Sequence, residues 1–311
     1  MTKHLIIATR GSALALWQAE YVKNLLQELD PSLNISFNII KTKGDIFLDV
    51  PLSKVGGKGL FVKEIEEALL DGRADLAVHS MKDVPMILPN GLILGCMPKR
   101  ASYLDCMLSC KYPSFYDLPQ NAHIGTSSLR RQAQLLSLRP DLKISNLRGN
   151  VNTRLKKLMD NEFDAIILAK AGIDRLNLDA PYLYPIDKEI MLPAPGQGAI
   201  GIECRENDLD LLIMFSELED RMTRVCVDAE RGFLRGLEGG CQVPIAGFAE
   251  MLNDETIHLK GLVAEINGSK CIMGNKEGDA SNAEKIGLSL ADELLKQGAK
   301  EILQKLYQQT N

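Results

Sequence analysis

Residues 4–31 read HLIIATRGSALALWQAEYVKNLLQELDP and predict a strand followed by a helix. Leu5–Ala8 is a short apolar run typical of a buried strand, and apolar side chains then recur at helical spacing from Leu14 onward. Ser12 stands where a helix N-cap is favoured, and Pro31 ends the pattern. This stretch therefore indicates the first strand-to-helix unit of an α/β fold.

The alternation of strands and helices continues up to about residue 80 and resumes near residue 105. An alternating strand at 35–39, a helix from 61 and a strand at 74–79 complete the order β-α-β-α-β. This order predicts an α/β domain with a largely parallel sheet. A second α/β run starts near residue 105, with strands at 123–125, 143–147 and 163–169, and with helices after Ser128 and near Asn152. Beyond about 220 the pattern becomes α+β, with a helix at 221–237, strands at 245–251, 257–266 and 270–275, and helices at 282–296 and 299–308.

Composition excludes several classes of protein. With 45% hydrophobic and 25% charged residues, the 311-residue chain has the proportions of a soluble globular protein. No run of about 18 apolar residues occurs and no signal sequence begins the chain, so we expect a cytoplasmic protein without membrane contact. Seven cysteines without a C-x-x-C pair, and four scattered histidines, predict neither a disulfide framework nor a metal site.

Charge is concentrated in one segment. The chain carries a net charge of −5, yet residues 126–157 hold eight basic residues and one acidic residue. Such a segment could be a solvated basic face, a nucleic-acid groove or a pocket for a small, highly anionic ligand. The segment contains no Phe, Tyr or Trp on which bases could stack, which disfavours nucleic acid.

Three predicted strand-to-helix junctions combine arginine with small polar residues. They are Arg10-Gly11-Ser12, Thr126–Arg131 and Arg148-Gly149-Asn150. A helix N-terminus attracts anions, and the guanidinium fork pairs bidentately with carboxylate or phosphate. Because such junctions lie at the carboxyl ends of strands, where ligands of α/β proteins bind, we expect a ligand with several negative groups. The phosphate-binding motif G-x-x-x-x-G-K-[ST] is absent.

Three further segments are candidates for chemistry. Asp83, in HSMKDVP at 79–85, follows a buried strand and is a candidate catalytic carboxylate, with a capping or ion-pairing role as the alternative. Cys241, in GGCQVP at 239–244, lies on a glycine-rich turn that either admits a bulky group beside the thiol or is a plain turn. Residues 41–60 form a long glycine-containing loop that we interpret as a lid.

These segments, together with GGKGLF at 56–61 and PGQG at 195–198, resemble the porphobilinogen deaminase (hydroxymethylbilane synthase) family from Arg10 to the C-terminus. The resemblance implies an α/β fold of two periplasmic-binding-protein-like lobes with mixed sheets, plus a C-terminal α+β domain. It divides the chain into residues 1–98 with 199–217, 104–192, and 220–311. We also expect a monomer, and the net charge and the lack of aromatic residues in the basic segment disfavour a nucleic-acid partner.

The resemblance further implies a transferase that condenses four porphobilinogen molecules head to tail, with loss of ammonia, to give hydroxymethylbilane. The growing chain would be anchored on a dipyrromethane cofactor, attached by a thioether to Cys241, and Asp83 would stabilise the cation that forms when ammonia leaves. A hypothesis of another class is a non-catalytic two-lobe binding or sensor module for an oligo-carboxylate. The remaining cysteines are assigned to packing.

Matching motif positions imply which residues bind. Each pyrrole carries an acetate and a propionate, and burying these charges unpaired would be prohibitive. The cofactor is expected to contact Ser12, Lys82, Asp83, Thr126, Ser128, Arg130, Arg131, Arg148, Gly149 and Cys241. The substrate is expected to contact Arg10, Ser12, Gln18, Lys54, Lys58, Phe61, Ser80, Arg148, Arg154 and Arg175.

Overall fold

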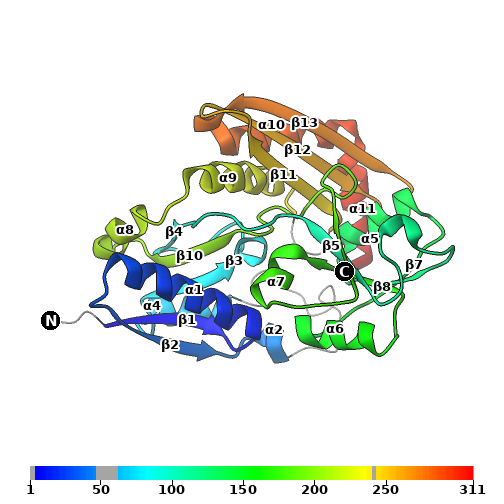
Figure 1. Cartoon of the computed structure of the whole chain (residues 1–311). Coiled ribbons are helices and arrows are strands. Elements are labelled where there is room, and N and C mark those ends of the chain that lie inside the picture. Colours follow the sequence, from blue (N-terminus) through cyan, green and yellow to red (C-terminus); the bar gives the residue numbers. More distant parts are fainter. Residues whose placement is uncertain (1–3, 47–61, 240–242, 311) are drawn as a thin grey trace. The chain divides into compact units, whose positions relative to one another are not determined.

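The computed structural model describes residues 4–46, 62–239 and 243–310 (Figure 1). The chain forms two compact units. The first comprises the described residues of 1–50 and 55–101 together with 199–224, and the second comprises 102–198 and the described residues from 225 onward. The division into three domains predicted from the family resemblance remains a prediction.

The first unit contains a five-stranded sheet in the order β2-β1-β3-β10-β4. β1 is parallel to β2 and β3, whereas β10 is antiparallel to β3 and β4, so the sheet is mixed. The strands are β1 (His4–Arg10), β2 (Asn34–Ile40), β3 (Leu76–Ser80), β4 (Leu92–Cys96) and β10 (Ile200–Arg205). The helices are α1 (Ala13–Leu29), α2 (Lys43–Ile46), α4 (Lys63–Leu70), α8 (Leu209–Ser216) and the short 3-10 helix η1 (Met81–Asp83).

Alternation along β1 explains why helices pack on this sheet. Leu5 and Ile7 belong to the same hydrophobic core as Val22 and Leu26 of α1. Ala8 belongs to a second core, which includes residues of α4. Successive strand side chains point to opposite faces, so the two helices bury different faces of the sheet.

The second unit begins with a sheet in the order β7-β6-β8-β5-β9. β6 is parallel to β7 and β8, and β5 is antiparallel to β8 and β9. The strands are β5 (Asp105–Ser109), β6 (His123–Gly125), β7 (Lys143–Ser145), β8 (Ala165–Ala169) and β9 (Tyr182–Ile186). The helices are η2 (Phe115–Asp117), α5 (Leu129–Leu138), α6 (Val151–Met159) and α7 (Lys170–Arg175).

The C-terminal part is an antiparallel sheet with helices, as expected. The elements are α9 (Arg221–Gly236), β11 (Ile245–Met251), β12 (Thr256–Ala264), β13 (Cys271–Asp279), η3 (Ala280–Asn282), α10 (Ala283–Leu294), the π-helical turn η4 (Leu295–Ala299) and α11 (Lys300–Thr310). Phe233 of α9 packs so closely on the sheet that a Cβ at Gly261 would lie 2.5 Å from its ring. Two mixed sheets followed by an α+β part confirm the predicted fold class.

Some local expectations need correction. The helix placed near Asn152 begins after Asn150, whose side chain caps it. The strand placed at 143–147 ends at Ser145. Among the described cysteines, 96, 106, 204 and 226 are buried, and 110 and 271 are half-buried. No helix in the described part of the chain has the length and apolar character needed to cross a membrane.

Candidate functional site

The polar edge of the first sheet is formed by the ends of β1 and β3. These strands are parallel neighbours, so Arg10 and Ser80 end at the same edge of the sheet. Ser12 is the N-cap of α1, and its Oγ accepts a hydrogen bond from the Ala15 N–H at 3.3 Å. The cap predicted from sequence is confirmed, and it turns the start of α1 toward this edge.

Gln18 and Ser80, both predicted to bind substrate, contact each other. The Gln18 amide donates a hydrogen bond to Ser80 Oγ at 2.9 Å, and the Gln18 side chain is buried. The contact ties α1 to the end of β3. It therefore holds in place the residues that follow Ser80.

Those residues form η1, in which Met81 is buried, Lys82 is half-buried and Asp83 is exposed. The Met81 N–H donates to the Ala199 carbonyl at 3.0 Å. A Cβ at Gly201 would lie only 2.3 Å from Met81 Sδ, so glycine at this position leaves room for the Met81 side chain. With Met81 fixed against β10, the Asp83 carboxylate lies at the surface of the first unit.

A buried acidic cluster lies on the α4 side of this sheet. His79 Nε2 is 2.9 Å from Glu203 Oε2, and both side chains are almost fully buried. Glu66 of α4 is also buried, and burial, followed by the nearby Glu203 charge, raises the pKa of its carboxyl to about 7. Glu66 Oε1 and Glu203 Oε1 have no hydrogen-bond partner in the described part of the chain. These carboxylates are therefore poorly neutralised.

In the second unit, two helix N-termini carry predicted binding residues. Ser128 caps α5, where its Oγ accepts from the Arg131 N–H at 3.4 Å and its own N–H donates to Thr126 Oγ1 at 3.2 Å. At α6, Gly149 has φ +106°, and a Cβ there would lie 2.7 Å from Thr153. A glycine is therefore required at this junction.

Three more predicted arginines belong to this unit. Arg154 Nε donates to the Gly149 carbonyl at 2.8 Å, and Arg175 Nη2 donates to the Gly198 carbonyl at 2.8 Å. Arg148 directly precedes Gly149 and is half-buried. The backbone contacts hold two of the guanidinium groups to loops of the same unit.

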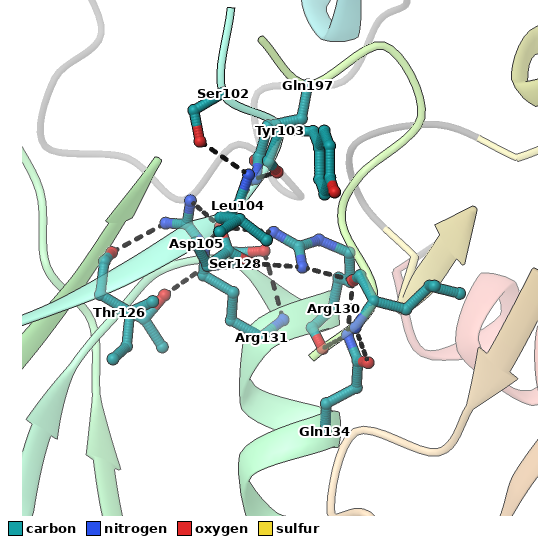
Figure 2. Close-up of polar contacts among 12 residues, drawn as sticks. Ser102, Tyr103, Leu104, Asp105, Thr126, Ser128, Arg130, Arg131, Gln134 and Gln197 are labelled. Atoms are coloured by element: carbon teal, nitrogen blue, oxygen red, sulfur yellow. Dashed lines mark hydrogen bonds and ion pairs between the residues drawn. The ribbon is translucent and has the colours of Figure 1, made fainter. Parts of the chain in front are cut away.

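Arg130 and Arg131 are buried around a carboxylate that the sequence interpretation missed (Figure 2). Asp105 Oδ2 lies 2.7 Å from Arg130 Nη1, and Asp105 Oδ1 lies 2.8 Å from Arg131 Nη2. The two guanidinium groups hold the pKa of Asp105 well below its usual range, despite complete burial. This cluster, Asp105 with Arg130 and Arg131, is called the Arg–Asp–Arg cluster below.

Comparison with known proteins identifies the family. Residues 5–212 match the family model described as "Porphobilinogen deaminase, dipyromethane cofactor binding domain", and residues 224–296 match "Porphobilinogen deaminase, C-terminal domain". The chain belongs to the porphobilinogen deaminase family. A porphobilinogen deaminase of Nitratidesulfovibrio vulgaris (strain DP4) is 61% identical over 98% of this chain and 97% of the relative. One from Lawsonia intracellularis is 57% identical over 98% and 99%.

Solved structures show only a distant likeness. The methionine-binding protein MetQ aligns with a TM-score of 0.43 and 14% identity, covering 69% of this chain and 89% of that protein. An arginine-specific periplasmic binding protein of Salmonella typhimurium gives a TM-score of 0.41, also at 14% identity.

Four of the residues expected to bind ligand in this family member lie outside the described residues. They are Lys54, Lys58, Phe61 and Cys241. The lid predicted at 41–60 is described only to residue 46 and includes the short helix α2. The other predicted residues lie in two sets, with Arg10, Ser12, Gln18, Ser80, Lys82 and Asp83 in the first unit, and Thr126, Ser128, Arg130, Arg131, Arg148, Gly149, Arg154 and Arg175 in the second.

The sequence analysis did not assign Asp105 or Gln197, whose amide donates to Asp105 Oδ1 at 3.0 Å. Asp105 opens the apolar run DCMLS, and an acidic residue at the start of a strand usually indicates a solvent-exposed end. The available signal was the adjacent pair Arg130-Arg131, because two arginines on a buried helix face require a buried acidic partner.

Proposed function

We propose that the chain condenses four porphobilinogen molecules head to tail, with loss of ammonia, to give hydroxymethylbilane. The observation that carries this proposal is the family match, which extends over nearly the whole chain at up to 61% identity among the relatives above. The reaction is a transfer of the pyrrolylmethyl group, and it belongs to tetrapyrrole and heme biosynthesis.

Asp83 is proposed as the catalytic residue. An aliphatic amine with a pKa near ~10 is protonated at neutral pH, so ammonia can leave the substrate without a strong acid. Its loss leaves positive charge spread over the pyrrole ring and the ring nitrogen. The Asp83 carboxylate would stabilise that charge and accept the proton released when the ring becomes aromatic again. Its exposed position on η1, next to half-buried Lys82, supports this role.

The remaining first-unit residues are proposed to position the substrate. Arg10 and Ser12 lie at the end of β1, and the Gln18–Ser80 contact lies at the end of the neighbouring strand. Arginine pairs bidentately with carboxylates such as the acetate and propionate groups of a pyrrole. Lys54 and Lys58, in the loop at 41–60, and Phe61 beside it are proposed to close over the substrate.

The dipyrromethane cofactor is proposed to be held by second-unit residues and by a thioether to Cys241. The Arg–Asp–Arg cluster fits such a group, because two buried guanidinium groups share one carboxylate and so favour a further anion. Thr126, Ser128, Arg148 and Gly149 would contact it from the ends of β6 and β7. When bound, the cofactor supplies the anchor that retains the growing product. Arg154 and Arg175 would bind carboxylates of the incoming substrate.

The same proposal includes a cytoplasmic monomer with three domains. The experiment that tests it incubates purified protein with porphobilinogen and measures ammonia and hydroxymethylbilane in parallel. Four ammonia molecules per hydroxymethylbilane are expected from the stoichiometry. Binding of porphobilinogen without ammonia release would instead indicate a binding or sensor module.

A further inference from the structure

We propose that Asp105 is a positioning residue for ligand binding, which fixes Arg130 and Arg131 side by side and leaves one excess positive charge for a single ligand carboxylate. The inference rests on the proposed function, because it assigns that carboxylate to the dipyrromethane cofactor. Asp105 itself would touch neither cofactor nor substrate. It would act through the two arginines.

Asp105 holds both guanidinium groups through several bonds. It is the first residue of β5, a strand paired on both sides, and it is completely buried. Arg130 approaches both carboxylate oxygens, with Nη1 2.7 Å from Oδ2 and Nη2 3.2 Å from Oδ1. Arg131 donates from Nε to Oδ1 at 3.0 Å. Bonds of this kind fix the plane of each guanidinium as well as its place.

Backbone carbonyls also hold the two guanidinium groups. Arg130 Nη1 donates to the Leu192 carbonyl at 2.8 Å, and Arg131 Nη1 donates to the Ile167 carbonyl at 2.8 Å. Gln197 donates to Asp105 Oδ1 at 3.0 Å and therefore fixes the carboxylate. Preorganised donors bind an anion more strongly than mobile ones, because less side-chain entropy is lost on binding.

The charges in the cluster do not balance. Two guanidinium groups face one carboxylate, and guanidinium does not lose its proton in proteins. The pKa of Arg131 is lowered by burial and by the Arg130 charge, and the opposing effect of Asp105 does not cancel them. One further negative charge would complete the neutralisation.

Access to the cluster is narrow. The side chain of Arg130 is 5% exposed and that of Arg131 is 8% exposed. Both residues lie in the first turn of α5, immediately after the Ser128 cap. Because so little of either side chain is exposed, the proposal limits the cluster to one ligand group, and the helix N-terminus favours an anionic one.

The test compares Asp105→Asn with wild-type protein made in cells that supply porphobilinogen. The folded fraction is isolated by size exclusion and checked by circular dichroism, and its mass is measured after denaturation. Loss of the charge that orients both arginines is expected to reduce the fraction carrying two pyrrole units about tenfold. For the folded protein, the kcat per total protein should fall in proportion to the amount that carries the two pyrrole units. The KM for porphobilinogen should not change.

Asp141→Asn is the matched control. Asp141 pairs with Arg139 in the same basic segment, through bonds of 2.7 and 2.8 Å, but the pair is partly exposed. Its loss should leave the adduct fraction at the wild-type level. If folded Asp105→Asn carries the adduct as fully as wild type, the positioning role is overturned and the proposed function stands. If wild-type protein carries no adduct, the proposed function itself fails.

A second variant covers the case in which Asp105→Asn does not fold. Gln197→Leu keeps all three charges and removes the hydrogen bond to Asp105 Oδ1, together with the one that the same amide donates to the Tyr103 carbonyl at 2.7 Å. The loss of one hydrogen bond to a charged group should lower the adduct fraction about threefold, with circular dichroism unchanged. Wild-type loading of this variant would overturn the inference.

Discussion

Each of the two units buries a cluster in which charges do not balance, and the imbalance has opposite signs. In the first unit, Glu203 pairs with His79, and the charge of Glu203 acts on the buried carboxyl of Glu66. In the second, Arg130 and Arg131 share one carboxylate. A buried carboxylic acid can take up a proton, as the raised pKa of Glu66 indicates, whereas a guanidinium cannot release one. Excess negative charge is thus neutralised by a proton within the protein. Excess positive charge instead favours the binding of an anionic ligand.

The residues proposed to react with or bind ligand differ between the units in the same way. The first unit presents the Asp83 carboxylate on a short helix, where positive charge can develop next to it. The second presents arginines and helix N-termini, which suit negative groups. We infer that the first unit supplies the chemistry and that the second unit supplies most of the arginines proposed to bind the carboxylates.

The largest expected effect separates these two roles. Asp83→Asn removes the charge that would stabilise the developing cation, so kcat should fall by at least about 10³-fold. Because Asp83 is exposed, the free energy of unfolding should stay within about 0.5 kcal/mol of wild type. Steady-state kinetics and urea unfolding measure the two quantities.

The control for Asp83→Asn is Asp71→Asn, which removes another carboxylate of the first unit, paired with Arg73 at the surface. Its kcat should equal that of wild type. Near-normal turnover of Asp83→Asn would refute the division of roles between the units.

A smaller effect tests the acidic cluster of the first unit, formed by His79, Glu203 and Glu66. Between pH 4.5 and 7 folded Glu66 binds its proton more tightly than unfolded Glu66, so its contribution to stability falls as the pH rises through this window. Above the window, ionised Glu66 destabilises the fold by up to about 3 kcal/mol. Glu66→Gln removes this dependence and should gain about 2–3 kcal/mol relative to wild type between pH 5 and pH 8. Urea unfolding at both pH values measures it.

Glu67→Gln serves as the comparison, because Glu67 is the next residue of α4 and is exposed. Its pH dependence should match that of wild type. If Glu66→Gln and Glu67→Gln show the same pH dependence, the first cluster is not neutralised by a proton and the contrast between the units is lost.

The smallest effects come from the helix caps. Ser12→Ala and Asn150→Ala each remove a side-chain cap and should each lower the free energy of unfolding by about 1 kcal/mol. Ser12 is also proposed to bind substrate, so Ser12→Ala should raise the KM for porphobilinogen about threefold, the effect of one modest hydrogen bond. Asn150→Ala should leave KM unchanged. Equal KM values for the two variants would limit Ser12 to capping.

Local sequence patterns predicted most elements because their signals are local. Leu5–Ala8 is apolar enough to identify β1, Ser12 and Ser128 cap the helices expected after them, and β11 spans 245–251 as predicted. The insertion of β10 between β3 and β4 has no such signal. This strand lies more than 100 residues from its partners, and only tertiary packing brings them together. The family resemblance, not the residues, placed that segment in the first domain.

Site residues that belong to a local sequence motif could be predicted, whereas those brought together only by burial could not. The segment Arg148-Gly149-Asn150 predicts a strand-to-helix junction, and the positive φ of Gly149 agrees with this prediction. By contrast, nothing near Asp105 in the sequence indicates that Arg130 and Arg131 fold onto it. The pairing joins residues from two elements about 25 positions apart. The individual binding roles stay predictions.

The central claim is that a polycarboxylate ligand is tethered through the sulfur of Cys241. The measurement that tests it most directly is the mass of the denatured, purified protein, compared with that of Cys241→Ala. The account predicts that the wild-type mass exceeds the sequence mass by two pyrrole units, and that the variant shows no excess. An active wild-type protein at the unmodified mass, or an excess that persists in Cys241→Ala, would contradict it.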